Sequence, residues 1–114
     1  EPLEFRKNKS YLKFLEKQLN ECIPECNEIV IAYEPIWSIG TGLVPDYEEI
    51  YEVQEYVKSF LKNQKSIKNI SVLYGGSVSS NNIKHIIKES KVDGALIGGS
   101  SLDDKEILKI ISIL

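Results

Sequence analysis

Three short loops hold the residues of this chain that could do chemistry. The first loop runs from Glu34 to Gly42 and directly follows an unbroken apolar run that ends at Tyr33. A carboxylate at the end of a buried strand is partly desolvated, which tends to raise its pKa and to make it a better general base. Glu34 is therefore the first candidate catalytic residue.

The rest of this first loop has the composition of a hinged lid. Pro35 fixes one backbone angle at its start, and Trp37 supplies an aromatic anchor. Gly40 and Gly42 permit backbone shapes that other residues resist. The pattern favours a lid over Glu34. Judged by composition alone, an ordinary loop with an exposed glutamate is an equal alternative, because glycine and proline are common in most loops.

The other two loops are rich in glycine and suit a phosphate. One spans residues 74–78 and contains Gly75-Gly76-Ser77, and the other spans 96–100 and contains Gly98-Gly99 just ahead of a predicted helix. Glycine lets the backbone approach a ligand closely, and N–H groups at a helix N-terminus favour a phosphate. Either glycine pair alone is weak evidence, but two such loops after consecutive strands predict a phosphorylated ligand.

Alternating helices and strands are predicted to position these loops. Apolar periodicity predicts helices around residues 12–22, 50–60, 83–87 and 107–114, and short apolar runs predict strands at 29–33, 70–74 and 95–97. The first apolar run is unbroken, which suits a strand buried on both faces. Asp46 and Glu49 have the spacing of an acidic capping box ahead of the second helix. The order αβαβαβα predicts an α/β fold with parallel strands and crossover helices.

Residues 1–114 are expected to form a single partial domain whose upstream half is missing. Three parallel strands are too few to close a barrel, and both outer strands would remain open edges. The chain also opens with Glu1 and contains no methionine. Both features favour a piece of a longer sheet.

Composition excludes several classes of function. The formal net charge is -3 and there is no long basic run, so a nucleic-acid partner is not expected. No apolar stretch approaches the ~18 residues of a membrane span, so a membrane partner is not expected either. Cys22, Cys26 and the single histidine, His85, do not form a metal-ligand set, and we expect free thiols and a surface or packing histidine.

Three separated segments resemble the triosephosphate isomerase family, and the resemblance extends over the whole chain. Residues 32–42 resemble the family's catalytic and lid segment, residues 74–78 its second phosphate loop, and residues 92–99 its last strand and third phosphate loop. Glu1 resembles the glutamate that ends the family's preceding loop. The resemblance implies the C-terminal part of a TIM (β/α)8 barrel, beginning just after the fifth strand.

The resemblance also implies a reaction and a set of site residues. Glu34 would be the base that moves a proton between dihydroxyacetone phosphate and glyceraldehyde 3-phosphate through an enediolate, without a cofactor or metal. The residues implied to hold the phosphate are Gly40, Ser77, Gly98 and Gly99. The residues implied to form the lid and its closure are Pro35, Trp37, Ile39, Tyr74 and Leu96. Ile39 and Leu96 would close over the carboxylate, while Tyr74 and Ser77 would bond the closed lid.

Two positions depart from the family pattern. Ser38 stands where this lid usually has alanine, and its small size predicts a modest effect on closure. Pro45, in a hinge that varies within the family, is expected to limit hinge motion. The family's catalytic lysine and electrophilic histidine lie in its N-terminal half, so we expect the isolated chain to be inactive. The whole enzyme is implied to be a cytoplasmic homodimer of glycolysis and gluconeogenesis.

Two alternatives remain beside this interpretation. Another sugar-phosphate barrel enzyme, such as a relative of ribulose-phosphate epimerase, would share the glycine loops but would not need Glu34-Pro35 followed by Trp37. A non-catalytic phosphate-binding partial barrel, assembled with a partner half-barrel, would keep its function after Glu34→Ala. The residues of the first loop favour the isomerase over both alternatives.

Overall fold

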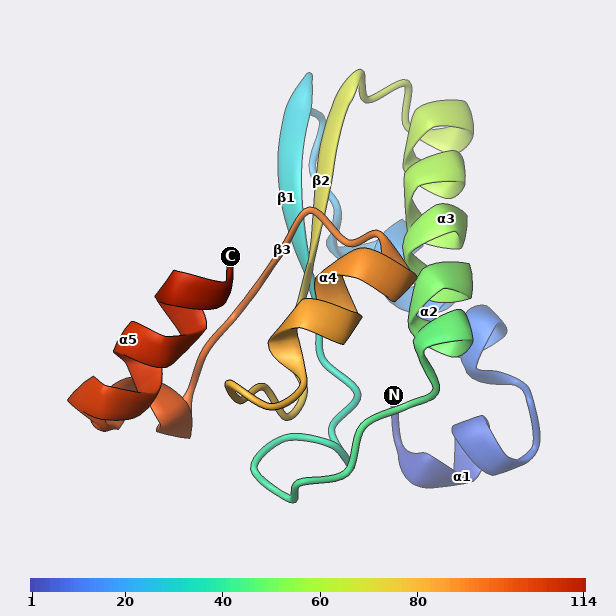
Figure 1. Ribbon diagram of the computed structural model, residues 1–114. Coiled ribbons are helices and arrows are strands. Elements are labelled where there is room, and N and C mark those ends of the chain that lie inside the picture. The colour runs from blue at the N-terminus through green and yellow to red at the C-terminus, as the bar shows by residue number, and fades with distance from the viewer.

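Three parallel strands form the sheet of the computed structural model, which describes residues 1–114 (Figure 1). The strands lie in chain order: β1 (Glu28–Tyr33), β2 (Asn69–Tyr74) and β3 (Gly94–Ala95). β1 pairs with β2 in register from Glu28↔Asn69 to Tyr33↔Tyr74, and β3 pairs with the end of β2. This parallel order is the one that crossover helices require.

Five α-helices and one 3-10 helix accompany the sheet. They are α1 (Leu3–Lys7), α2 (Tyr11–Cys22), α3 (Tyr47–Gln64), α4 (Ile83–Ser90), the 3-10 helix η1 (Gly99–Leu102) and α5 (Asp104–Ile113). The apolar periodicity predicted α2, α3, α4 and α5. It missed α1 and η1, because helices of one turn are too short to show a period.

The hydrophobic core lies between the sheet and helices α2, α3 and α4. On α3, Ile50, Val53, Val57 and Leu61 are at most 3% exposed, and their spacing places them on one face. Phe60, an apolar residue at the end of the predicted helix 50–60, is only partly buried. At the start of α3 the Glu49 carboxylate accepts a hydrogen bond from the Asp46 N–H at 3.3 Å, as the capping box predicts.

The prediction that the first strand is buried on both faces is wrong. Ile29 and Ile31 are half-buried, whereas Val30 on the opposite face is 60% exposed and Ala32 is exposed. The alternation arises because no element of the chain covers the face that carries Val30. An unbroken apolar run therefore marks a strand suited to two-sided burial, although this chain buries only one side.

The third strand and the last helix differ from their predicted limits. The sequence placed the strand at 95–97, but β3 ends at Ala95, and beyond it only Leu96 keeps a sheet bond, from its N–H to the Tyr74 carbonyl at 2.8 Å. β3 has a partner strand on one side only, which leaves Ile97 outside the ladder. On α5 only Ile110 is buried, and the predicted apolar residues Leu108, Ile111 and Leu114 are between 61% and 70% exposed.

None of the helices combines the length and the apolar character that crossing a membrane would require.

Candidate active site

The carboxyl ends of the three strands bring the three candidate loops side by side. The Gly75 N–H donates to the Tyr33 carbonyl at 2.8 Å, and the Leu96 N–H donates to the Tyr74 carbonyl at 2.8 Å. Each loop thus starts beside the next one, at the lower end of the sheet in Figure 1. An open cavity of about 650 Å³ lies between them. This end of a parallel sheet is where α/β proteins usually bind ligands.

Seven of the ten predicted site residues line this cavity. They are Glu34, Ile39, Gly40, Ser77, Leu96, Gly98 and Gly99. The other three predicted residues lie behind the lining: Pro35 and Tyr74 are buried and Trp37 is half-buried. Residues as far apart in the sequence as Glu34 and Gly99 therefore face one space.

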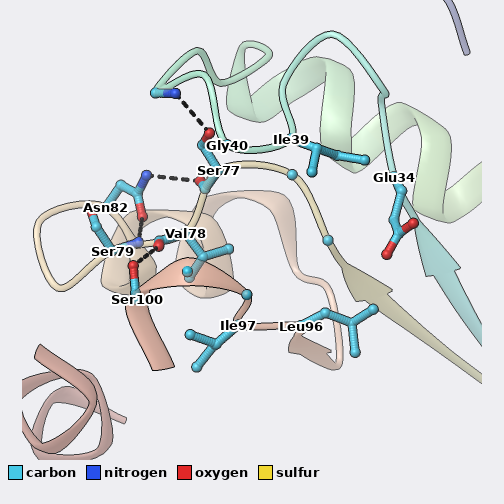
Figure 2. A pocket seen from close by; sticks show the side chains of 15 residues that line it. Glu34, Ile39, Gly40, Ser77, Val78, Ser79, Asn82, Leu96, Ile97 and Ser100 are labelled. Carbon is cyan, nitrogen blue, oxygen red and sulfur yellow. Dashed lines mark hydrogen bonds between the residues drawn. The ribbon is translucent and has the colours of Figure 1, made fainter. Parts of the chain in front are cut away.

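Glu34 stands on one wall of the cavity with two apolar side chains. Figure 2 shows Glu34, Ile39 and Leu96 on the same side, away from the serine-rich wall. Ile39 is 45% and Leu96 39% exposed, and Glu34 itself is exposed. The expected partial desolvation of Glu34 is therefore not found in this chain, because the two apolar side chains stand beside the carboxylate without covering it.

Three backbone donors at the cavity have no hydrogen-bond acceptor within the protein. The Gly40 and Gly98 N–H groups lie outside every helix and strand and make no hydrogen bond. Gly99 is the first residue of η1, so its N–H has no partner inside the helix. Gly40 has a φ of 67°, a conformation that glycine adopts without strain. These unpaired donors suit an anion in the cavity.

The fourth predicted phosphate donor is already engaged. The Ser77 N–H donates to Ser38 Oγ at 3.1 Å, and the Ser77 hydroxyl donates to the Ser38 carbonyl. The Gly42 N–H donates in turn to Ser77 Oγ at 3.0 Å, and the Tyr74 hydroxyl lies 3.0 Å from Ser38 Oγ. Tyr74 and Ser77 thus both bond the segment 35–45, hereafter the lid.

Asn82 and Ser100 brace the two glycine loops, and the sequence patterns did not identify either residue. Asn82 donates from its amide to the Ser77 carbonyl at 3.1 Å and accepts from the Ser79 N–H at 2.9 Å (Figure 2). Ser100 donates from its hydroxyl to the Val78 carbonyl at 2.8 Å, which joins the second loop to the third. The only sequence signal was a polar residue ahead of a helix, which is common at turns.

A buried ionic cluster supports the base of the lid. The Arg6 guanidinium donates to Glu1 Oε1 at 2.8 and 3.1 Å, and the Tyr33 hydroxyl and the Trp37 indole N–H lie 3.2 and 3.5 Å from the same oxygen. Burial, and after it the Glu1 carboxylate, raises the pKa of Tyr33. Burial alone would lower the pKa of Arg6, but Tyr33 and Glu1 raise it on balance. Arg6 therefore stays charged beside the Glu1 carboxylate, which also accepts from Trp37.

The cysteines and the histidine, which the sequence did not assign to a metal site, lie apart from the cavity. No three histidine, cysteine, aspartate or glutamate side chains gather as metal ligands. His85 is exposed on α4, where its Nδ1 lies 2.6 Å from Glu89 Oε1. Cys22 and Cys26 are free thiols.

Comparison with known proteins identifies relatives over the whole chain. Residues 1–114 match the family model described as triosephosphate isomerase. A triosephosphate isomerase of Amoebophilus asiaticus is 40% identical over 122 residues, covering 100% of this chain and 48% of the relative. Another, from Orientia tsutsugamushi (strain Ikeda), is 44% identical over 115 residues, covering 97% and 46%. The chain therefore spans about half the length of the curated relatives it matches.

A solved structure agrees with this similarity. The crystal structure of triosephosphate isomerase from Bartonella henselae superposes with a TM-score of 0.82 and 33% sequence identity, covering 99% of this chain and 46% of that one. The predicted fold class is confirmed: the chain is an α/β part of a TIM (β/α)8 barrel, with parallel strands and crossover helices.

Proposed function

Because this chain belongs to the triosephosphate isomerase family, we propose that the whole protein interconverts dihydroxyacetone phosphate and glyceraldehyde 3-phosphate, with Glu34 as the base. One observation carries the proposal. The Glu34 carboxylate opens on the same cavity as the unpaired N–H groups of Gly40, Gly98 and Gly99. A base on one wall and anion donors on another are what the isomerisation of a small phosphorylated sugar needs.

In the proposed reaction, Glu34 removes a proton from one carbon beside the substrate carbonyl and returns it to the other. The intermediate is an enediolate, whose charge needs an electrophile. Ile39 and Leu96 stand beside the carboxylate, and their closure over the substrate would exclude water and strengthen the base. The glycine donors hold the phosphate, which fixes the carbon chain relative to Glu34.

The electrophile is not provided by this chain in the proposed mechanism. The only histidine, His85, is exposed on α4 and pairs with Glu89. We therefore propose that residues 1–114 act as a single partial barrel domain that has no isomerase activity alone. The same proposal includes a role in glycolysis and gluconeogenesis, a cytoplasmic location and a homodimeric whole protein. Light scattering of the whole protein tests whether it is a dimer.

The experiment is an isomerase assay with glyceraldehyde 3-phosphate on the full-length protein, meaning this chain with any sequence that precedes it in its gene. Glu34→Gln should lower turnover by about 10²–10⁴-fold, because a positioned general base contributes that much. Glu25→Gln, at an exposed glutamate before β1, is the matched control and should retain turnover.

Two results would argue against the proposal. Full turnover by the Glu34→Gln protein would assign the base to another residue. A folded full-length protein that binds phosphate but does not turn over would favour the non-catalytic phosphate-binding barrel, which retains the glycine donors and needs no base.

A further inference from the structure

Ser38 is fully buried in the lid and joins it to the rest of the site. We propose that the Ser38 hydroxyl is a latch that holds the tip of the lid against the second glycine loop and the sheet, so that Ser38 is a positioning residue for the reaction. The inference deepens the proposed function and rests on it for the role of the lid.

The Ser38 hydroxyl makes every hydrogen bond that a serine hydroxyl can make. It donates to the Leu43 carbonyl at 2.5 Å and accepts from the Ser77 N–H at 3.1 Å. Its third partner is the Tyr74 hydroxyl at 3.0 Å. Because the single Ser38 hydrogen is used on Leu43, the Tyr74 hydroxyl must be the donor in this pair.

These three bonds reach three different parts of the site. Ser38 and Leu43 flank the glycine tip of the lid, so their bond closes the tip into a ring. Tyr74 is the last residue of β2 and is fully buried, which anchors the ring to the sheet. Ser77 belongs to the second glycine loop. One hydroxyl therefore fixes the lid tip to the sheet and to a phosphate loop together.

The backbone of Gly76 leaves room for this arrangement. A Cβ atom at position 76 would lie 2.5 Å from Ser38 Oγ and even closer to the Tyr74 hydroxyl oxygen. Any side chain at Gly76 would therefore displace both hydroxyls. The latch thus depends on the glycine beside it as well as on Ser38.

The latch also has a consequence for ligand binding. The Ser77 N–H, a predicted phosphate donor, points at Ser38, which does not line the cavity. A phosphate that takes this N–H must first break its bond to Ser38. An alanine at this position would have no hydroxyl to compete. The small size of Ser38 predicts only a modest effect on lid closure, and the latch adds a specific role for its hydroxyl.

Amide hydrogen exchange of the full-length protein tests the latch. Ser38→Ala should accelerate exchange of the Ser77 and Gly42 amides by about tenfold, since the loss of a buried bonding partner has that effect. The Gly75 amide, which bonds the Tyr33 carbonyl in the sheet, should keep its rate. Ser38→Thr, which retains the hydroxyl, should restore slow exchange.

Ser112→Ala is the matched control. Ser112 is an exposed serine on α5 whose hydroxyl donates to the Lys109 carbonyl, and its loss should not alter exchange at Ser77. Unchanged exchange at Ser77 in Ser38→Ala would overturn the latch. So would an equal acceleration at Gly75, which would indicate general destabilisation.

Tyr74→Phe tests the same latch if the Ser38 variants fold poorly. This substitution removes the hydrogen bond between Tyr74 and Ser38 while leaving Ser38 in place. It should accelerate exchange of the Ser77 amide by about threefold. In a Ser38→Ala background, Tyr74→Phe should cause no further acceleration of Ser77 exchange. An additive acceleration would overturn the proposal that the two hydroxyls act together. Amide exchange is measured without catalysis. These experiments can therefore test the latch even if the isomerase assay fails.

Discussion

The side chain of Glu34 lies directly against the backbone of Gly75, the first residue after β2. A Cβ atom on Gly75 would lie 2.7 Å from Glu34 Cγ and 3.0 Å from Glu34 Oε1. Any side chain at position 75 must therefore push the carboxylate away from its present place. The glycine thus helps to set the position of the proposed base.

Gly75→Ala should lower the kcat of the full-length protein by about 10²-fold, because a misplacement of about 1 Å costs that much in a positioned reaction. The affinity for phosphate should hardly change, since the unpaired donors lie at Gly40, Gly98 and Gly99. Steady-state kinetics and phosphate competition separate the two effects.

Gly94→Ala is the control for this substitution. Its Cβ would meet only the flexible end of Leu73, at 2.9 Å, which can move aside. Circular dichroism should find both variants folded. An unchanged kcat in Gly75→Ala would mean that the Glu34 position tolerates displacement.

Gly99→Pro should weaken binding of a phosphate ligand by about tenfold or more, because a hydrogen bond to a charged group is lost. Proline is tolerated at the first position of a helix, where its missing N–H has no partner in the helix. Gly99→Ala retains the N–H, and its Cβ would have no neighbour within 4 Å, so it should bind normally. Calorimetric titration with inorganic phosphate measures both, and equal affinities would remove Gly99 from the phosphate site.

Arg6→Gln should lower the free energy of unfolding by about 3 kcal/mol, because it leaves the buried Glu1 carboxylate without its charged partner. The two side chains are 7% and 0% exposed and 2.8 Å apart. Lys17→Gln breaks an exposed pair with Glu21 and should change stability by less than about 1 kcal/mol. Urea unfolding measures the free energy of unfolding of both variants. Equal decreases in the two would mean that burial does not make the Arg6–Glu1 pair more important than the exposed one.

Asp93 should make the stability of the chain depend on pH in acid. Burial would raise its pKa, but hydrogen bonds from Lys58 and from the Val72 N–H outweigh burial and lower it below 3.8. A carboxylate with a lowered pKa stabilises the fold above its unfolded value, and the stabilisation is lost as the pH falls through the folded pKa.

Asp93→Asn should therefore be less stable than the wild type above about pH 4, and the difference should shrink as the pH falls further. Lys58→Gln removes the cation that lies 2.8 Å from the Asp93 carboxylate, so it should reduce the same pH dependence. Urea midpoints measured between about pH 2 and 6 follow both variants. A constant difference from the wild type over this range would exclude the ionisation of Asp93 as the cause.

Periodicity predicted much of the fold because the apolar residues on the buried face of a helix or strand recur at a fixed spacing along the chain. The stripe on α3 and the apolar run before Glu34 are both local patterns, and they correspond to α3 and β1. The same argument failed at Val30, whose exposure depends on what covers the far face of the sheet. It also failed for the buried face of α5, although it predicted the helix itself, because Ile110 alone is buried there.

Part of the candidate site followed from the sequence as well. Parallel strands carry their loops to one end of the sheet, so the order of elements was enough to expect Glu34 and the glycine pairs near one another. The structure places Glu34, Gly40 and Gly98 around a single cavity. Pairing in the sheet produces this arrangement, because each loop starts beside its neighbour.

The sequence by itself determined the order of the three strands and the four longer helices, the family, and the loops that could hold a base and a phosphate. Only the tertiary structure decided which polar groups are paired. Ser38 was a small substitution in the sequence but makes three hydrogen bonds in the fold. Asn82 and Arg6 carried no motif. Hydrogen bonds between side chains require donor–acceptor distances that are correct to within about a few tenths of an ångström between segments far apart in the sequence, and no local pattern encodes those distances.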